Sequence, residues 1–329
     1  MVPRKDWCDP SISNDRKTVP TQPIRERLRG IHAATVTPLT AAFAVDEAAL
    51  ADHVAPLART PGIRGLLVNG HAGENFTLPR GEKAKALGIV RETVPADCLI
   101  VAGVNAESSL DAADQARDAE AMGADAILVF PPNSWALTQD PDVILAHHRI
   151  VETATGLPIL LYQAPVGAGR MAYAKGVIEA LIASPRVVGV KEGSWEIATY
   201  EENARLIRAR RPDIAVLGSG DEHLLTSYLI GTDGSQVSLA AVVPEQIVAL
   251  FAAAEAQDWA RARAVHEALY PLAAAVYRRA PTGRATARLK TCLKLLGRLA
   301  SDRVCPPMVS PSPAEIAELE AALAVARAA

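Results

Sequence analysis

The sequence lacks cysteine pairs at a spacing that binds a metal or marks a disulfide framework. Its four cysteines, Cys8, Cys98, Cys292 and Cys305, are scattered through 329 residues. Isolated thiols in a chain of this length favour a reducing compartment, and we expect a cytoplasmic protein. The N-terminal segment MVPRKDWCDPSISNDRKTVP has no apolar core and does not resemble a secretory signal. No apolar run approaches the roughly 18 to 20 residues of a membrane-spanning helix, so no membrane partner is expected.

The sequence also lacks an excess of charge of either sign. There are 34 Lys and Arg residues and 37 Asp and Glu residues, which give a net charge of −3. This balance leaves no electrostatic footprint for nucleic acid, so we expect small molecules or further copies of the chain as partners. The basic stretch 278–290 contains no aromatic residue for base stacking, and it predicts a solvated helix face or a subunit contact.

What the sequence does contain is a regular alternation of short apolar runs and helical segments. The runs are 32–39, 65–69, 99–104, 126–132, 158–165, 187–193, 215–221 and 234–240. Each is bounded by Gly, Pro or polar residues, as expected of a parallel strand that is buried on both faces. Helices are predicted between them, for example over 46–60, 79–94, 108–122 and 196–208. Ser108 can cap the third of these helices, and Gly123 follows its end.

This alternation predicts an α/β fold, a (β/α)8 TIM barrel with a C-terminal helical extension. An open doubly wound sheet would need a glycine fingerprint after its first strand, and the sequence has none there. We assign residues 29–257 to the catalytic barrel and 258–329 to the C-terminal helical region. Residues 1–28 show no periodic pattern and predict an extension that is mobile or packs on a partner subunit.

Lys191 is the most informative residue at a strand end, which is where barrel enzymes place their chemistry. Alternation along the run 187–193 turns its side chain into the barrel. Burial there removes hydration from the ammonium group and lowers the lysine pKa, so more of the amine is nucleophilic at neutral pH. The alternative is a lysine at the barrel rim that pairs with Glu192.

Tyr162 ends the preceding strand and lies within reach of Lys191, because adjacent strands are about 5 Å apart. A phenol there can pass a proton in either direction, whereas the alternative is a tyrosine that only packs its ring. The loop 70-GHAGEN-75 follows the second strand, and its glycines let backbone N–H groups converge on a carboxylate. The same spacing also suits a simple turn.

We expect no metal and no cofactor. His71 and Glu74 could supply two metal ligands, but no third ligand has a suitable spacing. His147 and His148 are neighbours on a predicted helix and point about 100° apart, so they are poorly placed to chelate one ion. We interpret both as surface residues.

Four motifs in order resemble the dihydrodipicolinate synthase / N-acetylneuraminate lyase family. They are Thr37-Pro38, Gly70-x-x-Gly73-Glu74, Tyr162-x-x-Pro165 and Gly189-x-Lys191-Glu192. The resemblance covers residues 30–329, and 290–297 is similar to the family's late helix. It implies that Lys191 forms a Schiff base with pyruvate or a related 2-keto acid. It also implies that Tyr162 transfers protons and that the backbone of His71 and Ala72 holds the substrate carboxylate.

By the same resemblance, the reaction is aldol cleavage, aldol condensation or dehydration without a metal, and the assembly is a homotetramer built as a dimer of dimers. The protonated imine withdraws electrons and stabilises the enamine, which is why such a lyase needs no metal.

Several positions depart from the synthases of this family. The synthases have two threonines where this chain has His71 and Ala72, so the hydroxyl relay to the tyrosine is missing and His71 is a candidate replacement. A synthase tyrosine falls on Asn133, and the arginine that holds a second carboxylate falls on Gly167. Loss of this charge-assisted anchor argues against true lysine-pathway dihydrodipicolinate synthase activity. Arg170, three residues further on, is a candidate rescue of the contact.

The predicted site combines three catalytic residues with six substrate-binding positions. The catalytic residues are Lys191, Tyr162 and His71; the substrate-binding positions are Thr37, Ala72, Gly73, Asn133, Gly167 and Gln236. Together with Trp135, the positions 133, 167 and 236 form a neutral set that favours an uncharged polyol or aromatic tail.

Two alternatives stay open. Glycine-rich segments at 218–220 and 231–235 are typical of phosphate-binding barrels, although Asp221 and Glu222 would repel the anion. A non-catalytic barrel that binds 2-keto acids would explain the missing hydroxyls, although it would have little use for a neutral lysine.

Overall fold

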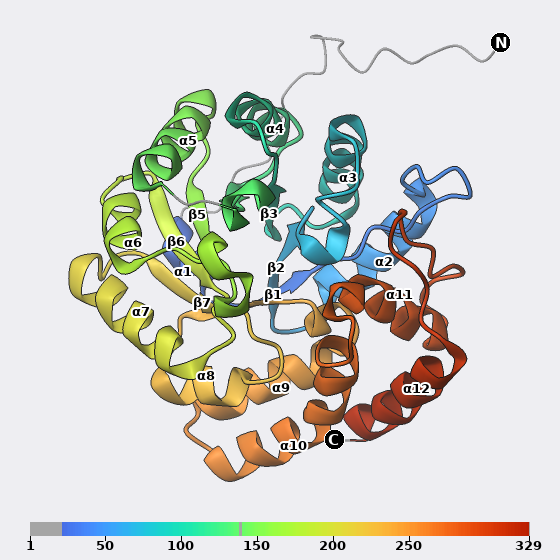
Figure 1. Cartoon of the computed structure of the whole chain (residues 1–329). Coiled ribbons are helices and arrows are strands. Elements are labelled where there is room, and N and C mark those ends of the chain that lie inside the picture. The colour runs from blue at the N-terminus through green and yellow to red at the C-terminus, as the bar shows by residue number, and fades with distance from the viewer. Residues whose placement is uncertain (1–21, 138–139, 329) are drawn as a thin grey trace, which may run out of the picture.

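A computed structural model describes residues 22–137 and 140–328, and within them eight parallel strands close into a barrel. The strands follow one another in chain order, and β1 pairs with β8 to complete the ring (Figure 1). Their bounds are β1 Gly30–Ala34, β2 Ile63–Val68, β3 Leu99–Val104, β4 Ala126–Val129, β5 Ile159–Gln163, β6 Val187–Glu192, β7 Ala215–Gly218 and β8 Gly234–Val237. The predicted (β/α)8 barrel is confirmed.

Helices follow the strands and surround the barrel (Figure 1). They are α2 Glu47–Arg59, α3 Arg80–Thr93, α4 Ser109–Ala121, α5 Pro141–Ala154, α6 Lys175–Ile182, α7 Ile197–Arg210, α8 Leu224–Ile230 and α9 Pro244–Glu255. Local signals set their ends, since the Asp46 side chain caps α2 and the Ser108 side chain caps α4. Gly123, just after α4, has a φ of +82°, a conformation that favours glycine.

Alternation along the strands divides the apolar side chains into two cores. On β5, Leu160 and Tyr162 belong to the core inside the barrel, whereas Leu161 belongs to the core between strands and helices. On β6, Val190 faces that outer core as well. Neighbouring residues on a strand face opposite ways, so Lys191 is directed into the barrel, as predicted.

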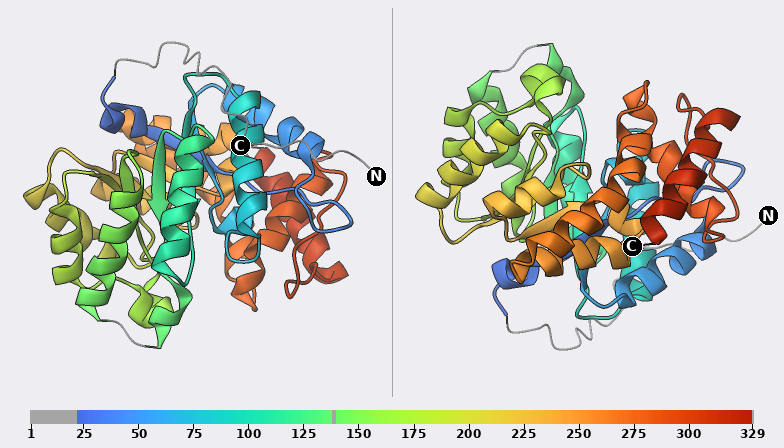
Figure 2. Two further views of the ribbon diagram at one scale, coloured as in Figure 1. Left: turned by 90° about the horizontal axis from the view of Figure 1, so that it is seen from above. Right: turned by 90° about the horizontal axis from the view of Figure 1, so that it is seen from below.

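A short helix, α1 (Ile24–Leu28), closes the amino ends of the strands. Leu28 is fully buried in the inner core, and the Arg27 guanidinium lies 3.0 Å from the Asp125 carboxylate. Figure 2 shows α1 at the far end of the barrel from the loops that follow β4 and β5. The last residues of the predicted extension therefore form part of the barrel floor, and its other residues, 1–21, lie outside the described residues.

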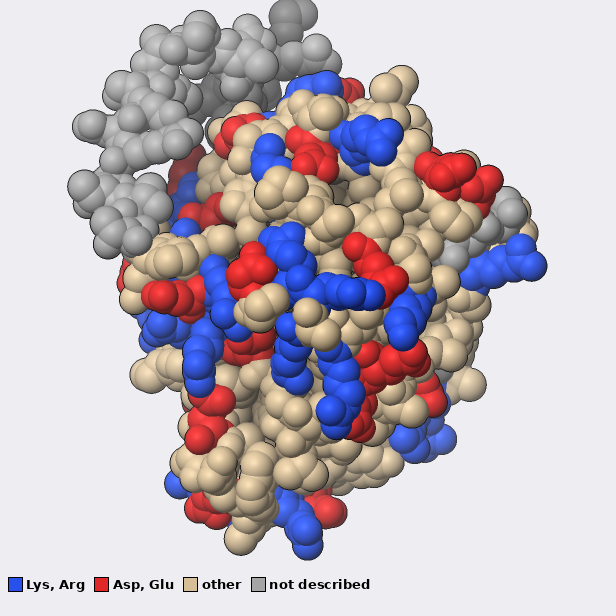
Figure 3. All heavy atoms as spheres, turned by 90° about the vertical axis from the view of Figure 1, so that its left-hand side faces the viewer, with Lys and Arg blue, Asp and Glu red and all other residues tan. Residues whose placement is uncertain are grey.

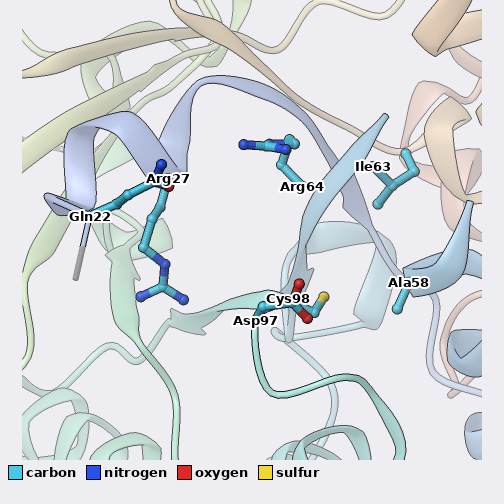
Figure 4. Close-up of a pocket in the computed structure, with 7 residues that line it drawn as sticks. All are labelled: Gln22, Arg27, Ala58, Ile63, Arg64, Asp97 and Cys98. Atoms are coloured by element: carbon cyan, nitrogen blue, oxygen red, sulfur yellow. The ribbon is translucent and has the colours of Figure 1, made fainter. Parts of the chain in front are cut away.

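Beside α1 lies a polar pocket of about 280 Å³ at the amino ends of β2 and β3. Its lining residues are Gln22, Arg27, Ala58, Ile63, Arg64, Asp97 and Cys98 (Figure 4). Burial raises the pKa of the Cys98 thiol to about 11, which leaves it unreactive at neutral pH. The Arg27 charge is already paired, and barrel enzymes react at the opposite, carboxyl end of the strands.

Three further helices lie together on one side of the barrel: α10 Trp259–Tyr277, α11 Ala285–Leu295 and α12 Pro313–Arg327 (Figures 1 and 2). The basic stretch predicted as a solvated face is exposed at Arg278 and Arg279, but Arg288 and Lys290 are fully buried. The Arg288 guanidinium donates to the carbonyl oxygen of Val276 at 3.0 Å. The prediction was wrong for these two residues because α11 is enclosed by its neighbours, which supply acceptors for the buried cations.

Charges of both signs are intermixed over the surface formed by α6 and α7 (Figure 3). Ion pairs connect Arg210 to Glu179 at 3.0 Å and Lys175 to Glu202 at 3.9 Å on this side. Among residues 22–137 and 140–328, no helix combines the length and the apolar character that a membrane crossing requires.

Candidate active site

Lys191 and Tyr162 meet at the carboxyl end of the barrel. Their Cα atoms are register partners on β6 and β5, and the Lys191 Nζ lies 5.6 Å from the centre of the Tyr162 ring. Both residues are buried, with exposures of 8% and 5%. The inward direction and the proximity that alternation and strand spacing predict are both present in the structure.

The Lys191 amine is held in an environment that favours its neutral form. Burial lowers its pKa to about 8, and the nearby Asp221 carboxylate opposes part of that change. With this pKa, about one amine in ten is uncharged at pH 7, against about one in 2,500 for a free lysine. The neutral form of the amine, which is the form able to attack a carbonyl, is therefore populated at physiological pH.

The Tyr162 phenol stays protonated in the same environment. Burial, and to a smaller extent the Glu192 carboxylate, raise its pKa above the usual value. Gly193, at the end of β6, faces the edge of the ring, because a Cβ there would lie 3.0 Å from Tyr162 Cε2. Gly193 therefore leaves the space that the ring needs beside Lys191.

The loop after β2 forms a single turn of 3₁₀ helix, η1 (His71–Gly73), above the barrel. The Thr37 hydroxyl donates to the Gly73 carbonyl oxygen at 3.1 Å, so this predicted substrate-binding residue holds the loop. A Cβ on Gly73 would lie 3.3 Å from the Thr35 carbonyl oxygen, a close contact that favours glycine here. The N–H groups of His71 and Ala72 begin the turn and have no acceptor among the described residues.

His71 is exposed as a residue at the mouth of the barrel, and its ring packs among aromatic side chains. Its centroid lies 4.6 Å from that of Phe130, 5.3 Å from that of Tyr162 and 5.8 Å from that of Phe76. Desolvation and the positive charge of Lys191 lower the His71 pKa below its ordinary value. The imidazole is therefore neutral at pH 7, close to the phenol.

Three other predicted site residues, Asn133, Gly167 and Gln236, differ in how deeply they are buried below the barrel mouth. Asn133 begins the 3₁₀ turn η2 (Asn133–Ala136), is exposed, and donates its N–H to Glu107 at 2.9 Å. Gly167 is exposed in η3 (Val166–Met171), and a Cβ there would meet nothing within 4 Å. Gln236, in contrast, is fully buried inside the barrel beside His32 on β1. Of these three residues, Asn133 and Gly167 are open to solvent at the rim.

Trp135, predicted to line the pocket, is buried with its ring centroid 5.4 Å from that of His147 on α5. One sequence interpretation beside it was wrong. His147 and His148, predicted at the surface, are both buried, and His148 Nε2 lies 2.9 Å from the Tyr173 hydroxyl. The sequence does not show that α5 is covered on this face by η2 and by the chain around Tyr173.

Asp221, in the loop directly after β7, is a candidate functional residue that the predicted set omits. Its carboxylate accepts the Leu239 N–H at 2.8 Å, and its charge acts on Lys191. Burial raises the Asp221 pKa to about 6, against the opposing effects of that N–H and of Lys191. The signal was present, because Asp221 is a charged residue at a strand end, where charge is costly unless it is used.

No group of three or more His, Cys, Asp or Glu residues in the described part of the chain is arranged to hold a metal ion. A buried lysine with a lowered pKa beside a protonated tyrosine, at the carboxyl ends of a barrel, suits an imine-forming lyase of the class I aldolase type.

Residues 27–326 match the Dihydrodipicolinate synthetase family, and the chain belongs to this family of class I aldolase-type lyases. It is 31% identical over 316 residues to the 4-hydroxy-tetrahydrodipicolinate synthase of Kineococcus radiotolerans, covering 93% of this chain and 95% of the relative. It is 33% identical over 258 residues to 4-hydroxy-tetrahydrodipicolinate synthase 1 of Streptomyces coelicolor, covering 78% and 81%. The family resemblance found from the motifs is confirmed.

Among solved structures, the chain resembles YagE, a prophage protein of the dihydrodipicolinic acid synthase family from E. coli K12 that was crystallised in complex with pyruvate. The TM-score is 0.84 at 23% identity, covering 91% of this chain and 99% of YagE. This likeness shows the fold.

Proposed function

We propose that the chain is a lyase that binds pyruvate or a related 2-keto acid as a Schiff base on Lys191. The single observation that carries the proposal is the buried Lys191 amine beside the Tyr162 phenol. The family to which the chain belongs and the pyruvate complex of YagE, a protein of the same fold, support it further.

In the proposed reaction, the neutral Lys191 amine attacks the carbonyl carbon of the keto acid. The carbonyl oxygen takes one proton from Tyr162 and one from the attacking nitrogen and leaves as water, which gives the protonated imine and the Tyr162 phenolate. The phenolate then takes a proton from the adjacent carbon, and the resulting enamine attacks an aldehyde in the condensation direction. In the cleavage direction, the carbon–carbon bond breaks to give the same enamine. The neutral Tyr162 ring, whose centre lies 5.6 Å from the Lys191 Nζ, supports this assignment of the proton transfers.

We further propose that the N–H groups of His71 and Ala72 bind the keto-acid carboxylate, and that His71 takes part in proton transfer with Tyr162. Both N–H groups lack an acceptor within the described residues, and the His71 ring is 5.3 Å from the Tyr162 ring. Because this imidazole is neutral, it enters the reaction as an acceptor or as a neutral N–H donor rather than as a cation.

The relatives named above are 4-hydroxy-tetrahydrodipicolinate synthases, and we propose that this chain has a different second substrate. At the rim, Gly167 and Asn133 carry no charge, so a second carboxylate has no bidentate partner at either position. A neutral polyol or aromatic tail suits these positions better. Arg170, exposed in the same 3₁₀ segment as Gly167, is the residue whose replacement tests this point.

Incubation with pyruvate and borohydride, followed by mass spectrometry, tests the central proposal. A pyruvyl adduct mapped to Lys191, and lost in Lys191→Ala, is the expected result. Labelling of another lysine, or no labelling, would refute it. Pyruvate release is then compared between 2-keto-3-deoxy sugar acids and arylidene pyruvates, which distinguishes a polyol tail from an aromatic tail on the second substrate. Formation of 4-hydroxy-tetrahydrodipicolinate that depends on Arg170 would overturn the substrate proposal.

We also propose a cytoplasmic homotetramer, a dimer of dimers. Cys98, Cys292 and Cys305 are free thiols, which suits a reducing compartment. Phe76 and Leu137 are 45% and 85% exposed near the barrel mouth and suit a subunit contact. Light scattering coupled to size-exclusion chromatography tests the assembly, and a monomer would refute it.

A further inference from the structure

The loop that carries His71 and Ala72 is tied to the C-terminal helical region by buried polar contacts. Glu74 directly follows η1, and one of its carboxylate oxygens pairs with the ammonium group of Lys290 on α11. Both side chains have an exposure of 0%. The other oxygen of Glu74 accepts the Cys305 N–H at 2.7 Å. The two charged residues are 216 positions apart in the chain.

Further contacts connect the same two parts of the molecule. The Lys290 Nζ donates to the Arg303 carbonyl oxygen at 2.8 Å, which fixes the segment that carries the Cys305 N–H. The Thr286 hydroxyl, also on α11, donates to the His71 carbonyl oxygen at 3.1 Å. The turn is therefore held by contacts with the C-terminal region at both of its ends, at His71 and at Glu74.

The backbone conformation of Glu74 shows why the turn needs these contacts. Its φ is +60° and its ψ is +38°, a left-handed conformation that is unfavourable for a residue with a side chain. Without Lys290 the Glu74 carboxylate would also be a buried charge with no cation beside it, which is strongly unfavourable. Both costs would drive the loop out of its present conformation.

We infer that Glu74 and Lys290 are positioning residues through which the C-terminal helices hold the turn 71–74 in the shape that receives a carboxylate. The identity of that carboxylate rests on the proposed function above, whereas the mechanical connection does not. By this inference, the C-terminal helical region contributes to the active site. Loss of its contact with the turn weakens recognition of the substrate carboxylate and leaves the position of Lys191 unchanged.

Arg288 provides a matched control for Lys290. It lies two residues earlier on α11, has the same exposure of 0%, and carries the same charge. Its guanidinium bonds to the Val276 carbonyl oxygen and to Glu315 of α12, and not to the turn. Replacing Arg288 therefore destabilises the same helix while leaving the Glu74 contact in place.

Hydrogen exchange followed by mass spectrometry tests the mechanical connection in the full chain. In Lys290→Met, peptides that cover residues 70–76 should exchange about tenfold faster or more, whereas in Arg288→Met they should exchange at the wild-type rate. Equal acceleration in both variants, or none in Lys290→Met, would overturn the inference. Glu74→Gln, which keeps the side-chain shape, serves the same purpose if Lys290→Met does not fold.

Imine trapping on Lys191 tests the link to substrate recognition, with pyruvate compared to acetone, which lacks the carboxylate. Lys290→Met should lose about tenfold or more of the preference for pyruvate, with unchanged trapping of acetone, and Arg288→Met should keep the preference. A retained preference in a variant whose loop exchanges faster would overturn the role in recognition. If the wild-type protein traps no pyruvate, the proposed function fails, and the exchange comparison still decides the connection.

Discussion

Tyr162 and Lys191 are register partners on adjacent strands, and burial moves their pKa values in opposite directions. The amine is easier to deprotonate than a free lysine, and the phenol is harder to deprotonate than a free tyrosine. Burial therefore favours the neutral form of both groups. Attack on a carbonyl requires a neutral amine, and protonation of the carbonyl oxygen requires a protonated phenol.

Replacing Lys191 by Met should stabilise the fold at pH 7 while abolishing the pyruvyl adduct. The unfolded chain binds a proton on this lysine more readily than the folded chain, so the folded state is destabilised below about pH 8. The difference is about 3 kcal/mol at pH 7. It disappears as the pH rises from 8 to 10.5, where the amine becomes neutral in both states.

Urea unfolding at pH 7 and at pH 10 measures this difference. Lys175→Met is the control, since Lys175 is 61% exposed on α6 and its removal should leave the free energy of unfolding nearly unchanged. A Lys191→Met protein that is less stable than wild type at both pH values would contradict the prediction.

Asp221→Asn should move the acidic limb of kcat/KM to lower pH. The Asp221 carboxylate raises the Lys191 pKa, so removing its charge lowers that pKa and makes the amine neutral at lower pH. The shift should be up to about one pH unit. The measurement is the pH dependence of kcat/KM above pH 6, where the Asp221 carboxylate is itself charged. Asp213→Asn, an exposed change, should leave the limb in place, and a shift of the limb to higher pH in Asp221→Asn would count against this role.

Tyr162→Phe should lower kcat by about a hundredfold to ten-thousandfold, because the reaction loses its proton donor. Borohydride should still trap an adduct on Lys191, since the amine remains buried. Tyr173→Phe is the control, because Tyr173 bonds to His148 and lies outside the site. That variant should lose about 1 kcal/mol of stability and keep its kcat. Full activity of Tyr162→Phe would remove the tyrosine from the mechanism.

His71→Gln should separate the two roles proposed for this residue. Its backbone N–H is kept, so KM for pyruvate should stay within about twofold, while kcat should fall about tenfold or more through loss of the imidazole. Desolvation of the packed ring and the positive charge of Lys191 lower the His71 pKa, so NMR titration of the wild-type ring should show no protonation at pH 6.5. A ring that titrates at its ordinary pKa, with kcat following it, would reverse the assignment of a neutral imidazole.

Prediction from sequence was most accurate where the physical signal is local. Runs of apolar residues bounded by Gly and Pro gave strands, and Ser108 and Gly123 gave the ends of α4. Prediction was less accurate where burial depends on what covers a helix. His147 and Arg288 are each polar on a helix surface, and only the packing of neighbouring elements encloses them.

The sequence by itself determined the barrel, its strand ends and the inward direction of Lys191, because each follows from spacing along a short stretch of chain. Only the tertiary structure decided that Asp221 acts on this amine and that Glu74 pairs with Lys290, 216 residues away. Such pairings depend on distances through space, which folding creates and which no local pattern contains.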